Sequence, residues 1–317
     1  MMAQMTRPSQ VLRLGTRGSM LARTQSQLIA DELMKIHTGL RVELVIVKTT
    51  GDRITDKALH EIGGKGLFTK EIEIALINGE IDFAVHSFKD VPVTMPLVEA
   101  AAEKLVIAAV PKREDPRDVM IMHKPDVVAL ADRAVVGSSS LRRRCQILDA
   151  SPKVRVVALR GNIDTRLRKL RAGEFDVVIL AMAGLLRAGL YDPSYMKPLP
   201  VDQMLPAAGQ GALALQCRRD DSPTRAILSN LNDPVTEQCV AAERAVVRAL
   251  NGDCHSPIAA LATFHDKFGP GMFNLRVTVG QPGGEPPVKR AEISVKPADF
   301  TPEIFAAAVV TALQAAV

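Results

Sequence analysis

The sequence is poor in aromatic residues, with no tryptophan, two tyrosines and 3% aromatics in 317 residues. Proteins that bind single-stranded nucleic acid stack the bases on aromatic side chains. This scarcity therefore argues against nucleic acid as a partner, even though the formal net charge is +5.

Cysteine pairs and long apolar runs are also missing. The four cysteines, at 145, 217, 239 and 254, form no Cys-x-x-Cys pair, so neither a zinc cage nor a disulfide framework is indicated. No apolar run approaches the roughly 18 residues that a membrane span needs. Residues 1–10 lack the apolar core and cleavage site of a signal peptide. We expect a cytoplasmic protein with free thiols, no metal and no membrane contact.

The length allows more than one domain, because single hydrophobic cores stop growing near ~250–300 residues. The rhythm of the sequence predicts three domains, the first made of residues 1–110 and 206–231, the second of 111–205 and the third of 232–317. Nothing in the sequence demands an assembly larger than a monomer.

Positive charge is concentrated in one segment. Residues 141–171 hold eight Arg and two Lys against two Asp, a net charge of +8, so the rest of the chain carries −3. Such a surface attracts anions, whether nucleic acid, phosphates or carboxylated small molecules, and the sign of the charge does not choose among them.

Strands alternate with helices over the first hundred residues, which indicates a mostly parallel α/β sheet. We expect strands at 11–14, 42–49, 81–85 and 105–110, and helices at 19–37 and 69–78.

A similar rhythm resumes after a charged segment bounded by prolines at 111–116, which predicts a hinge into a second α/β domain. Expected strands at 134–137, 154–159 and 176–181 are each followed by a helix. Small residues at 206–212 then lead back toward the first sheet. Two hinged, doubly wound domains joined by two crossovers resemble bilobed periplasmic binding proteins. A helix from 234 to 250, three strands and a last helix at 301–316 predict a small C-terminal α+β domain.

The segment Val-His-Ser-Phe-Lys-Asp-Val-Pro at 85–92 places four polar side chains directly after an apolar strand. Ligands usually bind at the carboxyl ends of strands in α/β sheets. Ser87, Lys89 and Asp90 are therefore candidate site residues, and Asp90 is a carboxylate with a cation beside it. The alternative is a solvated turn that Pro92 closes.

Serines and arginines follow three expected strands of the second domain, where helix N-termini and guanidinium groups attract anions. The candidates for anion binding are Ser139, Ser140, Arg142, Arg143, Arg160, Arg166 and Arg187. The alternative is that the serines are ordinary helix N-caps and that the arginines form a solvated face.

Two glycine-containing turns in the first domain carry further candidates. Arg17 and Ser19 stand at the first strand-to-helix turn and could face the same cleft as Asp90. Lys65 lies in a Gly-Gly-Lys-Gly loop that lacks the spacing of a P-loop, so a structural role competes with a functional one.

Cys254 follows a predicted helix end, in a turn that would leave its sulfur accessible, whereas the other three cysteines fall in helices or a strand. A Cys-His nucleophilic pair usually combines side chains from separate elements, whereas His255 is the immediate neighbour of Cys254 in the sequence. This argues against such a pair. An inert loop cysteine is the alternative.

Several short motifs follow one another along the chain. They include Arg-Leu-Gly-Thr-Arg-Gly-Ser at 13–19, Gly-Gly-Lys-Gly-Leu-Phe-Thr-Lys-Glu at 63–71, Val-His-Ser-Phe-Lys-Asp-Val-Pro at 85–92, Arg-Glu-Asp-Pro-Arg-Asp at 113–118, Ser-Ser-Leu-Arg-Arg at 139–143, Arg-Gly-Asn at 160–162 and Gly-Gln-Gly-Ala at 209–212. With these motifs in this order, the chain resembles the porphobilinogen deaminase (hydroxymethylbilane synthase) family of tetrapyrrole, porphyrin and haem biosynthesis. The resemblance extends from residue 11 to about 262.

The resemblance implies a transferase that joins four porphobilinogen molecules, releases ammonia at each step and extends a covalent dipyrromethane primer. It implies that Cys254 holds this cofactor through a thioether, and that Asp90, with Lys89, is catalytic. Cofactor contacts would come from Ser87, Lys89, Asp90, Ser139, Ser140, Arg142, Arg143 and Arg160, and substrate contacts from Arg17, Ser19, Lys65, Arg160, Arg166 and Arg187.

Two other functions compete with this interpretation. A non-enzymatic bilobed anion-binding protein would share the two hinged domains but would lack a reactive anchor. Binding of nucleic acid through residues 141–171 would make affinity for DNA or RNA strongly salt-dependent.

Overall fold

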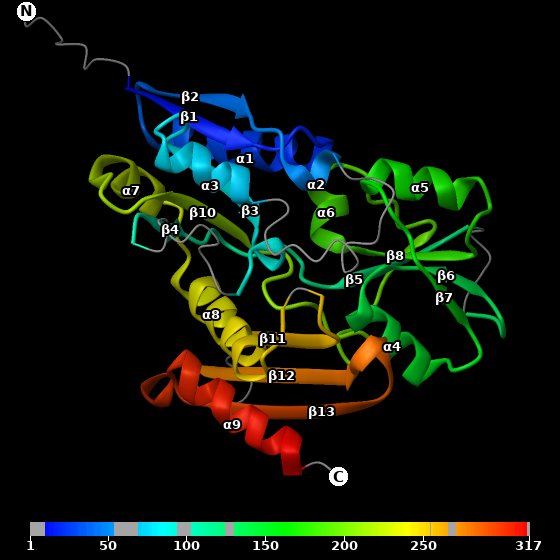
Figure 1. Ribbon diagram of the computed structural model, residues 1–317. Helices are drawn as coiled ribbons and strands as arrows, with labels where there is room; N and C mark the ends of the chain where they lie inside the picture. The colour runs from blue at the N-terminus through cyan, green and yellow to red at the C-terminus, as the bar shows by residue number, and fades with distance from the viewer. Residues whose placement is uncertain are drawn as a thin grey trace, which may run out of the picture.

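The computed structural model describes residues 10–53, 69–93, 103–123, 130–253, 255–265 and 271–315. Within these ranges the strands form three sheets, two with five strands and one with three. Figure 1 shows the first sheet in blue and cyan apart from its olive strand β10, the second in green, and the third in yellow and orange.

The first sheet has the strand order β2-β1-β3-β10-β4. Its members are β1 (Gln10–Thr16), β2 (Leu40–Ile46), β3 (Phe83–Ser87), β4 (Leu105–Ala109) and β10 (Leu213–Arg218). β1 runs parallel to β2 and β3, but β10 is antiparallel to β3 and β4. Four of the five strands therefore run in one direction, in agreement with the expected mostly parallel sheet. The exception is β10, which the chain inserts with the opposite direction when it returns from the second sheet.

Helices cover both faces of this sheet. The alternation along β3 directs Phe83 and Val85 toward a core with α1 (Met20–Ile36) and α7 (Ser222–Ser229), while Ala84 packs against α3 (Lys70–Ile77). α1 begins where Ser19 accepts a hydrogen bond from the backbone N–H of Ala22, so the serine is its N-cap. A short helix, α2 (Thr50–Arg53), follows β2.

The second sheet has the order β7-β6-β8-β5-β9. Its strands are β5 (Asp118–Met122), β6 (Val135–Gly137), β7 (Arg155–Val157), β8 (Val177–Ala181) and β9 (Met196–Pro198), and its helices are α4 (Leu141–Ala150), α5 (Ile163–Arg171) and α6 (Met182–Arg187). One face packs on α5 and α6, and the other packs on α4. The sequence analysis missed the antiparallel strands β5 and β9 and the helix α7.

The third sheet is an antiparallel meander of β11 (Ile258–His265), β12 (Met272–Gln281) and β13 (Glu285–Val295). α8 (Pro234–Ala249) and α9 (Pro302–Ala315) cover one of its faces, where Phe305 and Val309 of α9 are buried. The 3-10 helices η3 (Pro282–Gly284) and η4 (Pro297–Asp299) follow β12 and β13. The predicted fold class, two α/β parts with a small α+β part, is confirmed.

Two segments connect the first and second sheets. The first crossing, residues 110–117, joins β4 to β5, and the second crossing, residues 199–212, joins β9 to β10. At Gly211, in the second crossing, φ is +88° and a side-chain carbon would lie 2.4 Å from the Glu114 carbonyl oxygen of the first. Only glycine allows the two crossings to lie this close.

One buried carboxylate ties both crossings to the third sheet. Glu243 of α8 has a side chain with no exposed surface. Its oxygens accept two hydrogen bonds from the guanidinium of Arg113 in the first crossing, at 2.6 and 3.1 Å, one from Gly209 N–H in the second, and one from Ala262 N–H in β11. Four donors from three segments therefore converge on one side chain.

Replacing Glu243 by glutamine should lower the free energy of unfolding by about 3–5 kcal/mol, because it leaves the Arg113 charge buried without its partner. The urea midpoint, followed by circular dichroism, measures the loss. The matched control is Glu303→Gln, since Glu303 is 73% exposed in its 3.4 Å pair with Arg248 and should contribute only ~0–1 kcal/mol. Equal losses in the two variants would contradict the interpretation.

Candidate active site

A cavity of about 560 Å³ lies between the first and second sheets. α1, β3, α5, α6 and the turns at the ends of several strands contribute its walls. Among the described residues, the charged ones that line it are Arg17, Lys89, Arg143, Arg160, Arg166, Lys169 and Arg187 with Asp90 and Asp164, which gives them a net charge of +5. A cavity of this composition is suited to a ligand with several negative charges.

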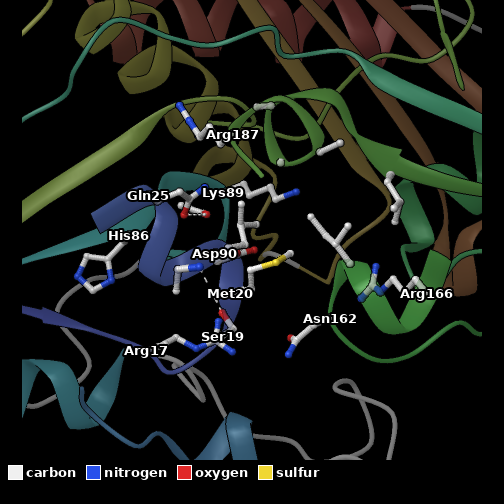
Figure 2. A pocket seen from close by; sticks show the side chains of 18 of the residues that line it. Arg17, Ser19, Met20, Gln25, His86, Lys89, Asp90, Asn162, Arg166 and Arg187 are labelled. Atoms are coloured by element: carbon white, nitrogen blue, oxygen red, sulfur yellow. Dashed lines mark hydrogen bonds between the residues drawn. The ribbon is translucent and has the colours of Figure 1, made fainter. Parts of the chain in front are cut away.

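Asp90 and Lys89 lie between the two walls of the cavity (Figure 2). Both belong to a single 3-10 turn, η1 (Phe88–Asp90), which follows β3 directly. The strand begins and ends two residues later than the sequence indicated, and its last residues, His86 and Ser87, pair with Ala214 and Leu213 of β10. Within the described residues, Asp90 is exposed to the cavity and makes no hydrogen bond or ion pair with another side chain.

Lys89 carries a charge that its surroundings partly disfavour. Its side chain lies deep in the cavity, and the loss of solvent lowers its pKa to about 8. The Asp90 carboxylate opposes this effect, while the Arg143 guanidinium adds to it. Lys89 is therefore a cation near neutral pH and loses its proton as the pH rises through about 8.

The α1 wall positions two predicted residues. Arg17 and Ser19 both line the cavity, at the turn from β1 into α1. Ser87, also a lining residue, donates a hydrogen bond of 3.2 Å to the Gln25 side-chain oxygen of α1. Sequence analysis missed Gln25, because a glutamine inside an amphipathic helix gives no signal until β3 is placed beside it.

The opposite wall is built by α5 and the turn that precedes it. Arg166 donates a 2.7 Å hydrogen bond from Nε to the Gly161 carbonyl, which holds its guanidinium over the start of the helix. Burial, together with the charges of Arg143 and Arg160, lowers its pKa to about 10, so three guanidinium groups lie near one another. Lys169, one turn after Arg166, lines the same wall and was also missed; its signal is the i, i+3 spacing on one helix face.

Arg187 closes the cavity at the end of α6. Its Nη2 donates a hydrogen bond of 2.7 Å to the Gly211 carbonyl of the second crossing. Burial lowers the pKa of this guanidinium. Arg187 thus connects the second sheet's wall to the segment that returns to the first sheet.

The candidates at the start of α4 have different surroundings. Arg143 lines the cavity, but Ser139, Ser140 and Arg142 are not among the lining residues of the described chain. Ser139 exchanges hydrogen bonds with the Leu159 backbone, and Ser140 is the N-cap of α4, accepting from Arg143 N–H. The ordinary N-cap that the sequence allowed is thus observed at Ser140.

Arg142 and Arg143 share one fully buried carboxylate, Asp118 at the start of β5. Oδ2 accepts from Arg142 Nη1 at 2.7 Å, and Oδ1 accepts from Arg143 Nε and Nη2 at 3.1 and 2.7 Å. Burial alone would raise the pKa of Asp118, but the two guanidiniums outweigh burial and hold it well below its usual range. The sequence offered Asp118 only as the end of a motif.

Lys65 and Cys254 lie outside the described residues, so their predicted roles stay predictions. On either side of position 254, Asp253 accepts hydrogen bonds from His255 N–H and from Ser256 Oγ, which form a compact turn. The other three cysteines are free and buried, as expected, and burial raises the pKa of each thiol, to about 11 for Cys145 and Cys217 and about 12 for Cys239.

His86 is part of the cavity lining but is unsuited to carry charge. Burial lowers its pKa to about 4, although its 2.9 Å contact with the Gln216 side-chain oxygen favours a proton. A neutral imidazole that donates from Nε2 to Gln216 satisfies both observations.

The described part of the chain contains no group of three or more His, Cys, Asp or Glu side chains that could hold a metal ion. Among the described helices, none is long and apolar enough to span a bilayer.

Comparison with known proteins identifies two family models along the chain. Residues 12–226 match the dipyromethane cofactor binding domain of porphobilinogen deaminase, and residues 237–304 match the C-terminal domain of the same family. Two curated porphobilinogen deaminases illustrate the similarity. The one from Acidithiobacillus ferrooxidans is 47% identical over 86% of both chains, and the one from Lawsonia intracellularis is 48% identical over 79% of both chains. Among solved structures, the methionine-binding protein MetQ aligns with 76% of this chain and 96% of its own, at 15% identity and a TM-score of 0.43.

The pKa of Lys89 should depend on Asp90. We expect the ammonium to titrate near pH 8 in the native protein and at a lower pH in Asp90→Asn, because the amide no longer stabilises the charged form. Carbon NMR of protein labelled at lysine Cε follows the titration, and Lys89→Arg identifies the signal. An unchanged Lys89 pKa in Asp90→Asn would show that the two groups do not interact.

Proposed function

Since the chain belongs to the porphobilinogen deaminase family, we propose that it joins four porphobilinogen molecules head to tail into hydroxymethylbilane and releases ammonia at each step. The observation that carries this function is the cavity itself. Among the described residues that line it, seven carry a cationic side chain and two carry a carboxylate, Asp90 and Asp164, and Asp90 lies beside Lys89.

The residues present fit the dipyrromethane cofactor of the family. Each pyrrole carries an acetate and a propionate, and burying such carboxylates requires charged partners. The described cavity offers them on both walls, from Arg17 on one side to Arg143, Arg160 and Arg166 on the other. When bound, dipyrromethane supplies the pyrrole carbon to which the first substrate is joined, and we assign its thioether anchor to Cys254.

Asp90 is proposed to act on the substrate's aminomethyl group. In the protonated aminomethyl group the carbon–nitrogen bond breaks, the nitrogen keeps the electron pair and leaves as ammonia, and the positive charge passes to the remaining methylene carbon and its pyrrole ring. A carboxylate fixed beside that charge stabilises the transition state. Because Asp90 makes no hydrogen bond within the described residues, its oxygens are available to the substrate.

Lys89 is proposed to supply a proton or a positive charge in the same place. Its depressed pKa, about 8, keeps proton transfer possible near neutral pH. The arginines have a different task, since they meet carboxylates that stay charged throughout the reaction. We therefore assign binding of cofactor and substrate to Arg17, Arg143, Arg160, Arg166 and Arg187, and retain Ser19, Ser87, Ser139, Ser140, Arg142 and Lys65 as predicted contacts.

We further infer that the three sheets belong to three domains with the bounds predicted from the sequence, and that the protein is a cytoplasmic monomer. The three described cysteines are free thiols, which is usual in a reducing compartment. Light scattering after gel filtration measures the mass in solution. We expect the mass of one chain, and a mass of two chains would contradict the monomer.

The mass of the purified protein tests the cofactor assignment. We expect an excess over the sequence mass equal to one dipyrromethane, and no excess in Cys254→Ser. Cys239→Ser is the control, because this thiol is buried and its pKa is raised to about 12, so the excess should remain. A native mass equal to that of the sequence after exposure to porphobilinogen would instead support the non-enzymatic anion-binding protein.

Asp90→Asn should lose turnover and keep its cofactor. We expect a fall in kcat of about 10²–10³-fold, because the amide removes the negative charge that faces the developing cation. The control is Asp164→Asn, the other acidic side chain of the cavity, which should lose far less. Rates come from the colour of pyrrole products, and intact mass verifies the cofactor. A similar loss in both variants would refute the special role of Asp90.

A further inference from the structure

We propose that Asp118 is a positioning residue for the reaction, which clamps the Arg143 guanidinium in the cavity wall near Lys89 and ties it to both crossings. The inference rests on the proposed function, since it concerns how a cavity arginine reaches its ligand. Asp118 itself does not line the cavity within the described chain.

The clamp fixes all three nitrogens of the guanidinium. Nε and Nη2 donate to Asp118 Oδ1, and Nη1 donates to the Ile179 carbonyl of β8 at 2.9 Å. Rotating the group out of this plane would break at least two of these bonds. One N–H on each of Nη1 and Nη2 is left over for a ligand in the cavity.

Asp118 also connects the clamp to the segments that join the two sheets. Its Oδ1 accepts a 3.0 Å bond from Gln210 Nε2, which also donates to the Pro116 carbonyl. Arg142 Nη1, bound to Oδ2, donates in addition to the Leu205 carbonyl. Pro116 lies in the first crossing and Leu205 and Gln210 in the second, so the contacts of Asp118 hold both crossings next to Arg143.

The charges of this cluster do not cancel. Two guanidiniums, 4% and 8% exposed at their side chains, share one carboxylate with no exposed surface. One positive charge is therefore left over, and Arg143 is the member that lines the cavity. A ligand carboxylate placed against Arg143 would complete the neutralisation, which gives a physical reason for anion affinity at this position.

The cluster also acts on Lys89. Arg143 and Arg142 lower the pKa of Lys89, whereas Asp118 raises it. Removing the Asp118 charge would thus lower the pKa of Lys89, because the effect of the two guanidiniums would be less well balanced. This effect distinguishes a positioning residue from one that only stabilises the fold, because a distant stabilising carboxylate would not change the pKa of Lys89.

The test compares Asp118→Asn with Glu243→Gln. Both remove the charge of a fully buried carboxylate that accepts four hydrogen bonds, but Glu243 is not among the groups that shift Lys89. For Asp118→Asn we expect KM for porphobilinogen to rise about tenfold, the scale of a lost charged hydrogen bond. We also expect the Lys89 pKa, read by carbon NMR, to fall below its native value. Glu243→Gln should change neither.

A second variant covers the case in which Asp118→Asn does not fold. Asp118→Glu keeps the charge, so the cluster stays neutralised to the same degree, but the longer side chain displaces the carboxylate from Arg143. We expect a raised KM with the Lys89 pKa unchanged. Native KM in Asp118→Glu, or equal KM and Lys89 pKa in Asp118→Asn and Glu243→Gln, would overturn the proposal.

Intact mass of each variant separates this proposal from the proposed function. Loss of the dipyrromethane mass from Asp118→Asn but not from Glu243→Gln would support the positioning of Arg143 toward the cofactor. Absence of that mass from the native protein would refute the proposed function, while the Lys89 titration would still test the link from Asp118 to the cavity.

Discussion

The structure depends on the pairing of buried carboxylates with guanidinium groups at the two crossings between the first and second sheets. A cavity that binds a polyanion needs positive charges in a place with little water, and such charges are costly to bury without partners. Asp118 and Glu243 provide these partners, each with four hydrogen bonds. Their positions explain why two crossings, α4 and α8 converge on the same region.

The arrangement of the sheets determines which charged residues meet at the cavity. β3 ends at the cavity on one side, and the first turn of α4, the turn that follows β7 and the end of β8 reach it from the other. α4 packs on the third sheet as well as the second, where a side-chain carbon at Gly280 would lie 2.6 Å from Cys145 Cβ. The third sheet therefore supports α4, whose first turn holds Arg142 and Arg143, and α4 lies between this sheet and the second one (Figure 1).

Much of this arrangement could be predicted from local patterns in the sequence. The helix at 20–36 follows an N-cap serine, and α8 follows an aspartate and a proline, signals that act within a few residues. Strand β5 gave no such signal, because it begins with a charged aspartate whose partners are 24 and 25 residues away. β9 has only three residues, and the direction of β10 depends on pairing with β3, more than 120 residues earlier. These features are set by tertiary contacts.

The candidate site, too, depends partly on local sequence patterns and partly on tertiary contacts. Arg17, Lys89, Asp90 and the arginines of the second sheet could be predicted, because charged residues after strands are visible in the sequence. The sequence could not show which charged side chains are already paired with a partner inside the protein. Asp118 and Glu243 have every oxygen engaged by guanidinium or backbone donors, whereas Asp90 has no such bond within the described residues and faces the cavity. A carboxylate whose neighbours already satisfy it stabilises the protein, and one left open to the cavity is available to the substrate. The contrast in hydrogen-bonding partners among these three acidic residues separates the supporting framework from the proposed catalytic group.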